Sequence, residues 1–109
     1  MNRVVRAEDY RRVVRRGRKV GSSHFVSYVF DRTDDGPVRF GFIVAKNVGN
    51  AVIRNRVRRR LKAASFDLLS RVRPGVDVVV RALPISAGAT WVTLRGEMLG
   101  IAARAEVKK

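Results

Sequence analysis

The chain contains no cysteine and only one histidine, and both scarcities limit the chemistry it can perform. Without cysteine there are no disulfides, no thiolate metal sites and no cysteine nucleophile, which is typical of a reducing cytoplasm. One histidine cannot build a metal cluster, and His24 lies within a strand pattern that favours a structural role. No apolar run approaches the roughly 20 residues of a membrane span, and the charged N-terminal segment lacks the apolar core of a secretory signal. We therefore predict a cytoplasmic protein with no membrane partner.

Acidic residues are scarce as well. There are 9 of them against 24 lysines and arginines, so the net charge is +15. Asp31, Asp34 and Asp35 form the best acidic cluster, but they lie among turn residues, and turn formation explains them better than metal binding. A protein nuclease would need spaced carboxylates or a histidine pair to hold metal or move protons. We therefore predict no catalytic residues, no protein metal site and a polyanionic partner.

The spacing of apolar residues predicts one α+β domain spanning residues 1–109. Aromatic and β-branched residues predict strands over 24–30 and 38–45, and the turn residues DRTDDGP between them predict a hairpin. We expect a two-layer α/β sandwich with a mixed sheet of roughly four strands. The predicted elements are a helix at 7–16, strands at 19–22, 24–30 and 38–45, a helix at 51–72, a strand at 77–83 and a helix from residue 90, in the order α-β-β-β-α-β-α.

Both long helices have a regular apolar stripe that should pack against the sheet. Arg56 and Arg60 border the stripe of the first long helix, and we expect them to reach along the groove between helix and sheet. The stripes consist of Ile53, Val57, Leu61, Ala64 and Leu68 in the first helix, and of Trp91, Leu94, Met98, Ile101 and Ala105 in the second.

The most informative segment is KNVGNAVIRNRVRRRLK, residues 46–62, in which a glycine-and-asparagine loop runs into an arginine-rich helix. Five arginines within seven residues repel one another, so their clustering indicates that a polyanion neutralises them. Unpaired N–H groups at the helix start could also meet a phosphate. The candidate nucleic-acid contacts are Lys46, Asn50, Arg54, Asn55, Arg56, Arg58, Arg59, Arg60 and Lys62.

The segment GFIVAKNVGNAVIRNRVRRRLK, residues 41–62, resembles the signature of the bacterial ribonuclease P protein component. Arg54, Asn55 and Arg56 stand at the Arg-Asn-Arg motif of that family, after a Lys-x-x-Gly-x-Ala-Val lead-in. The likeness extends over nearly the whole chain. It implies an α/β sandwich in which the strand-helix-strand unit carrying the motif has a left-handed crossover.

The resemblance also implies a function. The protein would be an accessory subunit that joins a catalytic RNA to remove the 5′ leader from precursor tRNA, with the RNA performing the hydrolysis with Mg²⁺. The arginine helix and Lys46 would face the catalytic RNA, and a cleft formed by sheet and helices would hold the single-stranded leader. We expect the protein alone to be monomeric. The residues implied in the cleft are Tyr10, Val14, Tyr28 and Phe25, and Val14 departs from the phenylalanine that relatives often carry.

Three alternatives remain open at the level of sequence. A ribosomal-protein-like RNA binder would share the size, charge and fold class, and only the long motif argues against it. A protein-only endonuclease would need an acidic metal-binding cluster. A DNA-binding protein is disfavoured because no helix-turn-helix partner precedes the arginine helix.

Overall fold

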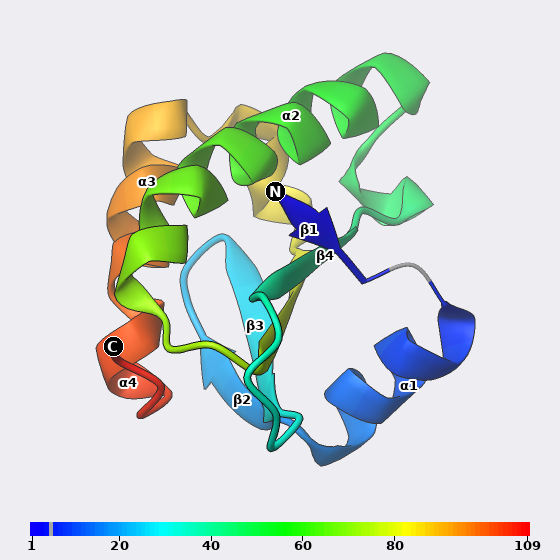
Figure 1. The fold of residues 1–109 in the computed structure, drawn as a ribbon. Coiled ribbons are helices and arrows are strands. Elements are labelled where there is room, and N and C mark those ends of the chain that lie inside the picture. The colour runs from blue at the N-terminus through cyan, green and yellow to red at the C-terminus, as the bar shows by residue number, and fades with distance from the viewer. Residues whose placement is uncertain (5) are drawn as a thin grey trace.

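A mixed sheet of five strands forms the centre of the molecule (Figure 1). The computed structural model describes residues 1–4 and 6–109. The strands lie in the order β1-β4-β5-β3-β2; β1 and β5 run parallel to β4, whereas β3 is antiparallel to β5 and to β2. The α+β class is confirmed, but the sheet has five strands instead of four because the two-residue β1 is too short to be seen in apolar spacing. Strand bounds are β1 (Asn2–Arg3), β2 (Arg18–Gly21), β3 (Phe25–Asp31), β4 (Arg39–Ile43) and β5 (Val76–Ala82).

The predicted hairpin between β3 and β4 is wrong, because β5 lies between these two strands. Val78, Val79 and Val80 of β5 are all fully buried, so this strand needs neighbours and cover on both sides. The segment after β3 instead turns against Gly75, whose N–H donates to the carbonyl of Gly36 at 2.7 Å. Gly75 has φ +82°, and a Cβ there would lie 2.0 Å from the carbonyl oxygen of Asp34, so only glycine fits.

The helices begin and end close to where the sequence predicts. Thr90 caps α3 by accepting a hydrogen bond from the N–H of Thr93 at 3.2 Å, as predicted. Gly100 interrupts the last predicted helix, and Trp91 is 40% exposed, so it does not extend the buried stripe. Helix bounds are α1 (Ala7–Arg16), α2 (Ala51–Leu68), α3 (Trp91–Leu99) and α4 (Ile101–Arg104), with 3-10 turns η1 (Lys46–Val48), η2 (Leu69–Arg71) and η3 (Pro84–Gly88).

Helices cover both faces of the sheet. The stripe of α2 is confirmed: Val57, Leu61, Ala64 and Leu68 are fully buried, and they form one core with α3, α4 and one sheet face. On the opposite face α1 packs its fully buried Val13 into a second, smaller apolar cluster. The predicted sandwich of sheet and long helices therefore forms, with α1 added on the other side (Figure 1).

The β4–α2–β5 unit joins two adjacent parallel strands through the arginine-rich helix. The left-handed sense that the resemblance implies for this crossover stays a prediction. Among residues 1–4 and 6–109, no helix has both the length and the apolar character that crossing a membrane requires.

Candidate nucleic-acid interface

The start of α2 is built by Gly49 and Asn50. Gly49 has φ 157° and ψ −169°, a backbone region that glycine occupies almost alone, and a Cβ there would lie 2.8 Å from the Ile53 side chain. The Asn50 side chain then accepts a hydrogen bond from the N–H of Ile53 at 3.0 Å and caps the helix. Asn50, a predicted RNA contact, therefore caps the helix through its side-chain oxygen, and the residue is exposed.

Two arginines of α2 hold the neighbouring η3 segment. Arg60 donates to the carbonyl of Ala89 at 2.7 Å, and Arg56 donates to the carbonyl of Ala87 at 3.5 Å. Both side chains are half-buried. The expectation that they run along the groove between α2 and the sheet is wrong, because η3 and α3 pack beside α2 and offer unpaired carbonyls. Part of the motif thus stabilises the fold.

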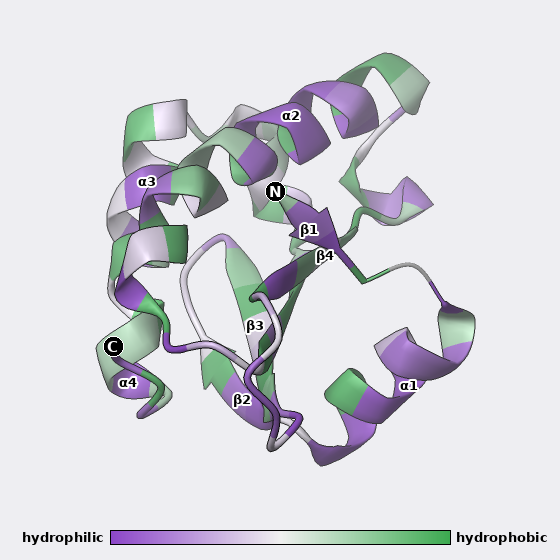
Figure 2. Ribbon diagram, in the orientation of Figure 1, coloured by the Kyte–Doolittle hydropathy of each residue, from purple (hydrophilic) through white to green (hydrophobic). Residues whose placement is uncertain are grey.

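The remaining cations of α2 point into solvent. Arg58, Arg59 and Lys62 are exposed, as is Asn55, whose side-chain oxygen accepts from Arg58 at 3.2 Å. Within the described part of the chain, no carboxylate forms an ion pair with any lysine or arginine of α2. Lys46, in η1 just before the helix, is exposed too. The middle of α2 is accordingly hydrophilic in Figure 2, and its unneutralised charge attracts polyanions.

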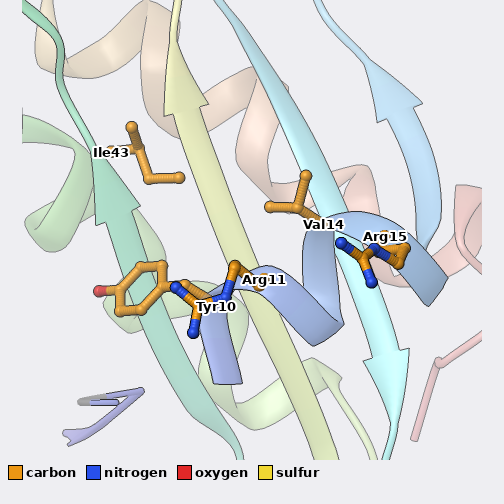
Figure 3. A pocket seen from close by; sticks show the side chains of 5 residues that line it. All are labelled: Tyr10, Arg11, Val14, Arg15 and Ile43. Carbon is orange, nitrogen blue, oxygen red and sulfur yellow. The ribbon is translucent and has the colours of Figure 1, made fainter. Parts of the chain in front are cut away.

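A groove of about 450 Å³ lies between α1 and the sheet (Figure 3). It is lined by Tyr10 and Val14 of α1, by Ile43 of β4, and by Arg11 and Arg15. The groove therefore combines an aromatic ring and aliphatic walls with two guanidiniums, the groups that bind the bases and phosphates of a single strand.

Tyr10 owes its position to Gly41 of β4. A Cβ on Gly41 would lie 2.7 Å from the tyrosine ring and from its hydroxyl, so the ring lies directly over the glycine backbone. Beside it, Val14 is 37% exposed. The structure thus places two of the four predicted cleft residues together.

The other two predicted cleft residues lie elsewhere. Tyr28 is only 7% exposed, and the guanidinium of Arg81 lies 5.9 Å from its ring centroid. Phe25 is fully buried in the core on the α2 side of the sheet, since it stands an odd number of residues from Tyr28 and successive strand residues alternate between faces. Neither residue therefore lines the groove, although Tyr28 belongs to the buried cluster against which Tyr10 and Ile43 pack.

Sequence reasoning missed three groove residues. Arg11 and Arg15 follow Tyr10 and Val14 by one residue each, so the same helical spacing places both pairs on adjoining strips of α1. Ile43 shares a sheet face with Gly41 because the two are two residues apart in β4. These spacings can be read from the sequence, but the packing of α1 beside β4 cannot.

The carboxylates are engaged in structural contacts. Asp77 is fully buried and accepts from Arg32 at 2.5 Å and from Arg39 at 2.7 and 2.8 Å. Asp77 raises the pKa of Arg39 through these hydrogen bonds. His24 has a structural role, as predicted, because its Nδ1 lies 2.5 Å from Glu97.

The turn assignment of the acidic cluster is confirmed for Asp31 and Asp34. Asp31 accepts from the N–H of Thr33 at 2.8 Å, and Asp34 accepts from the N–H of Gly36 at 2.8 Å. The Thr33 N–H and Arg73 lower the pKa of Asp31, and Arg32 with the Gly36 N–H lowers that of Asp34. Across the residues that the structure describes, no three His, Cys, Asp or Glu side chains gather as a metal site.

Comparison with known proteins gives consistent similarities. A sequence profile of the family described as Ribonuclease P matches residues 1–106. The ribonuclease P protein component of Clavibacter michiganensis is 50% identical over 104 residues, covering 95% of this chain and 92% of the relative. That of Rhodococcus erythropolis is 44% identical over 107 residues, covering 91% of this chain and 84% of the relative.

Solved structures share the fold. The RNase P protein of Staphylococcus aureus superimposes with a TM-score of 0.86 at 24% identity, covering 100% of this chain and 99% of the other. The RNase P protein of Thermotoga maritima gives a TM-score of 0.82 at 20% identity, covering 95% and 97%. At such identities the structures establish the likeness of fold alone.

Proposed function

Because the chain belongs to the ribonuclease P protein family, we propose that it joins a catalytic RNA and assists removal of the 5′ leader from precursor tRNA. Processing of tRNA 5′ ends follows from the family. The observation that carries the finer assignment is the presence of two different basic surfaces, the exposed cations of α2 and the aromatic groove beside α1. The exposed cations of α2 suit a folded RNA, and the aromatic groove beside α1 suits a single strand.

The α2 surface is the proposed contact with the catalytic RNA. Arg58, Arg59 and Lys62 are exposed and have no carboxylate partner in the described chain, so they can release counterions from RNA phosphates. Arg54 and Arg56 are half-buried and present fewer donors. Binding through α2 should therefore weaken steeply as salt concentration rises.

The groove is the proposed site of the leader. A base stacked on Tyr10 contributes about 1–3 kcal/mol, and this contribution tolerates any base because each has a π-face. Arg11 and Arg15 line the same groove and can bind the flanking phosphates. Because position 14 is valine, a leader base would stack on Tyr10, and Val14 and Ile43 would give the base aliphatic contacts.

The described carboxylates do not fit a magnesium site in the protein. Asp77 is saturated by two arginines, and Asp31 and Asp34 bind backbone N–H groups and arginines. The Mg²⁺ that the proposed reaction requires is therefore assigned to the catalytic RNA, and the protein contributes binding. We place this assembly in the cytoplasm, with the protein monomeric before it joins the RNA.

Substitution of Tyr10 tests the leader assignment. In the reconstituted holoenzyme, Tyr10→Ala should weaken binding of a long-leader precursor about 5- to 150-fold and leave mature tRNA binding unchanged, as expected for a lost stacking contact. Trp91→Ala is the matched control, because Trp91 is an exposed aromatic on α3, outside the groove. Equal losses for both RNAs would contradict leader binding in the groove and favour a general RNA binder of the ribosomal-protein kind.

A further inference from the structure

A second hollow, of about 210 Å³, lies at the β1 edge of the sheet. Arg3 of β1, Tyr10 of α1, and Arg58 and Lys62 of α2 all line it, together with Phe42 of β4. These residues are far apart in the sequence, and the fold alone brings them together. Its volume is below the roughly 300–1,000 Å³ of pockets that enclose a drug-sized molecule, so it suits a single chemical group.

The charge of this hollow indicates which group it receives. Arg3, Arg58 and Lys62 are all exposed, and the described residues that line the hollow include no carboxylate. None of the three forms an ion pair within the described residues, and Arg58 bonds only to the neutral Asn55. Three unneutralised cations around a small space favour a phosphate, which accepts hydrogen bonds on several oxygens at once.

Tyr10 connects this hollow to the α1 groove. Its side chain lines both spaces, so a strand lying along the groove reaches the hollow at the tyrosine. On its other side the hollow is bounded by α2, the surface proposed for the catalytic RNA. The hollow therefore lies where a strand would leave the groove and approach that RNA.

We propose that Arg3, Arg58 and Lys62 together hold one backbone phosphate of the leader at the point where it passes from the α1 groove to α2. This rests on the proposed function and adds a defined site to it. Arg58 and Lys62 lie where the leader and the catalytic RNA would meet and can contact both, whereas Arg3 belongs to neither the arginine helix nor the groove and is therefore the distinguishing residue. The backbone of β1 is held by β4, with the N–H of Val4 donating to Phe40 at 3.0 Å, so the Arg3 side chain is not needed for folding.

Neutral phosphate analogues provide the test. A series of precursor tRNAs, each with one methylphosphonate in the leader, is bound to holoenzyme carrying wild-type protein or Arg3→Gln. With the wild type, one leader position should lose about tenfold in affinity when neutralised, as expected for a charge-assisted contact. With Arg3→Gln, the unmodified precursor should bind about threefold more weakly, and neutralising that same position should then cost less affinity than it costs the wild type, because both changes remove the contact of Arg3 with the phosphate while Arg58 and Lys62 keep theirs.

Arg71→Gln is the matched control, since Arg71 is an exposed arginine beyond the far end of α2 and makes no side-chain hydrogen bond in the described chain. It removes the same charge and should leave the methylphosphonate profile unchanged. Arg3→Lys should restore part of the affinity. The slope of log affinity against log salt concentration should fall for Arg3→Gln by no more than about 0.7, the value for complete loss of one single-strand phosphate contact.

Two results would overturn the site. One is additive losses from Arg3→Gln and methylphosphonate at every leader position. The other is an equal loss of affinity for the catalytic RNA without substrate, which would assign Arg3 to that RNA. Failure of the proposed function is distinguishable, because in that case the wild-type protein would not increase precursor binding or cleavage at all.

Discussion

The proposed function gives the arginines of α2 two separate roles, one in the fold and one in RNA binding, and single substitutions should separate them. Arg60 is half-buried and donates to the carbonyl of Ala89, a residue that is itself 5% exposed, at 2.7 Å. A hydrogen bond from a charged donor contributes about 1.5–3 kcal/mol when the acceptor has no substitute partner. Because Arg60 keeps some contact with water, we expect Arg60→Ala to lower the free energy of unfolding by about 1.5 kcal/mol.

Arg58 lies two residues earlier but is exposed, and among the described residues its side chain bonds only to Asn55. Exposed substitutions of this kind change the free energy of unfolding by about 0.5 kcal/mol or less. If Arg58 contacts RNA phosphate, Arg58→Ala should reduce the slope of log affinity against log salt by about 1. Arg60→Ala and Arg58→Ala thus test whether one arginine of the cluster stabilises the fold while its neighbour binds RNA.

The assay combines urea unfolding of both variants with titration of the catalytic RNA at several salt concentrations. Arg60→Ala should shift the urea midpoint, and Arg58→Ala should shift RNA affinity with an unchanged midpoint. Equal destabilisation by both substitutions would refute the division of the helix into structural and RNA-facing arginines. Unchanged RNA affinity in Arg58→Ala would refute the RNA contact.

Three further predictions concern residues that position the groove or stabilise the fold. Gly41→Ala should push the Tyr10 ring aside, because the new Cβ would lie 2.7 Å from it. Leader affinity should fall, as titration would show, and urea unfolding should show a fall of about 1 kcal/mol in the free energy of unfolding. Asp77→Asn leaves two guanidiniums without their buried counter-charge, so the free energy of unfolding should fall by about 3 kcal/mol, and an unchanged urea midpoint would contradict this. The pKa values of Asp31 and Asp34 are lowered in the folded state, so their contribution to stability is present at neutral pH and is lost as pH falls below about 4. Unfolding curves at pH 6 and pH 3 measure this loss of stability. Asp31→Asn should make the difference in stability between the two pH values smaller.

Local features of the fold were predictable from the sequence. The bounds of α1, the Thr90 cap and the buried stripe of α2 follow from interactions between residues a few positions apart. The strand pairing could not be predicted from the sequence, because the place of β5 between β3 and β4 depends on contacts between distant segments. Nothing in a turn-rich sequence such as DRTDDGP distinguishes a hairpin from a turn that packs against Gly75.

The candidate site shows the same limit. The arginine cluster was visible as a run of letters, but only the structure shows that Arg56 and Arg60 bind η3 while Arg58 faces solvent. The resemblance implies that Phe25 lies in the cleft, but strand alternation places it on the face opposite Tyr28. Arg3 carried no signal, because its role depends on where a two-residue strand lies.

The central claim is that this protein assists an RNA that performs the chemistry, and reconstitution tests it most directly. Cleavage of a precursor tRNA at low magnesium is measured in buffer, with the protein alone, with a bacterial ribonuclease P RNA alone, and with protein and RNA together. We predict rapid release of the leader only in the combined sample. Cleavage by the protein alone would contradict the assignment of the chemistry to RNA, and absence of enhancement despite tight RNA binding would contradict the role in leader removal.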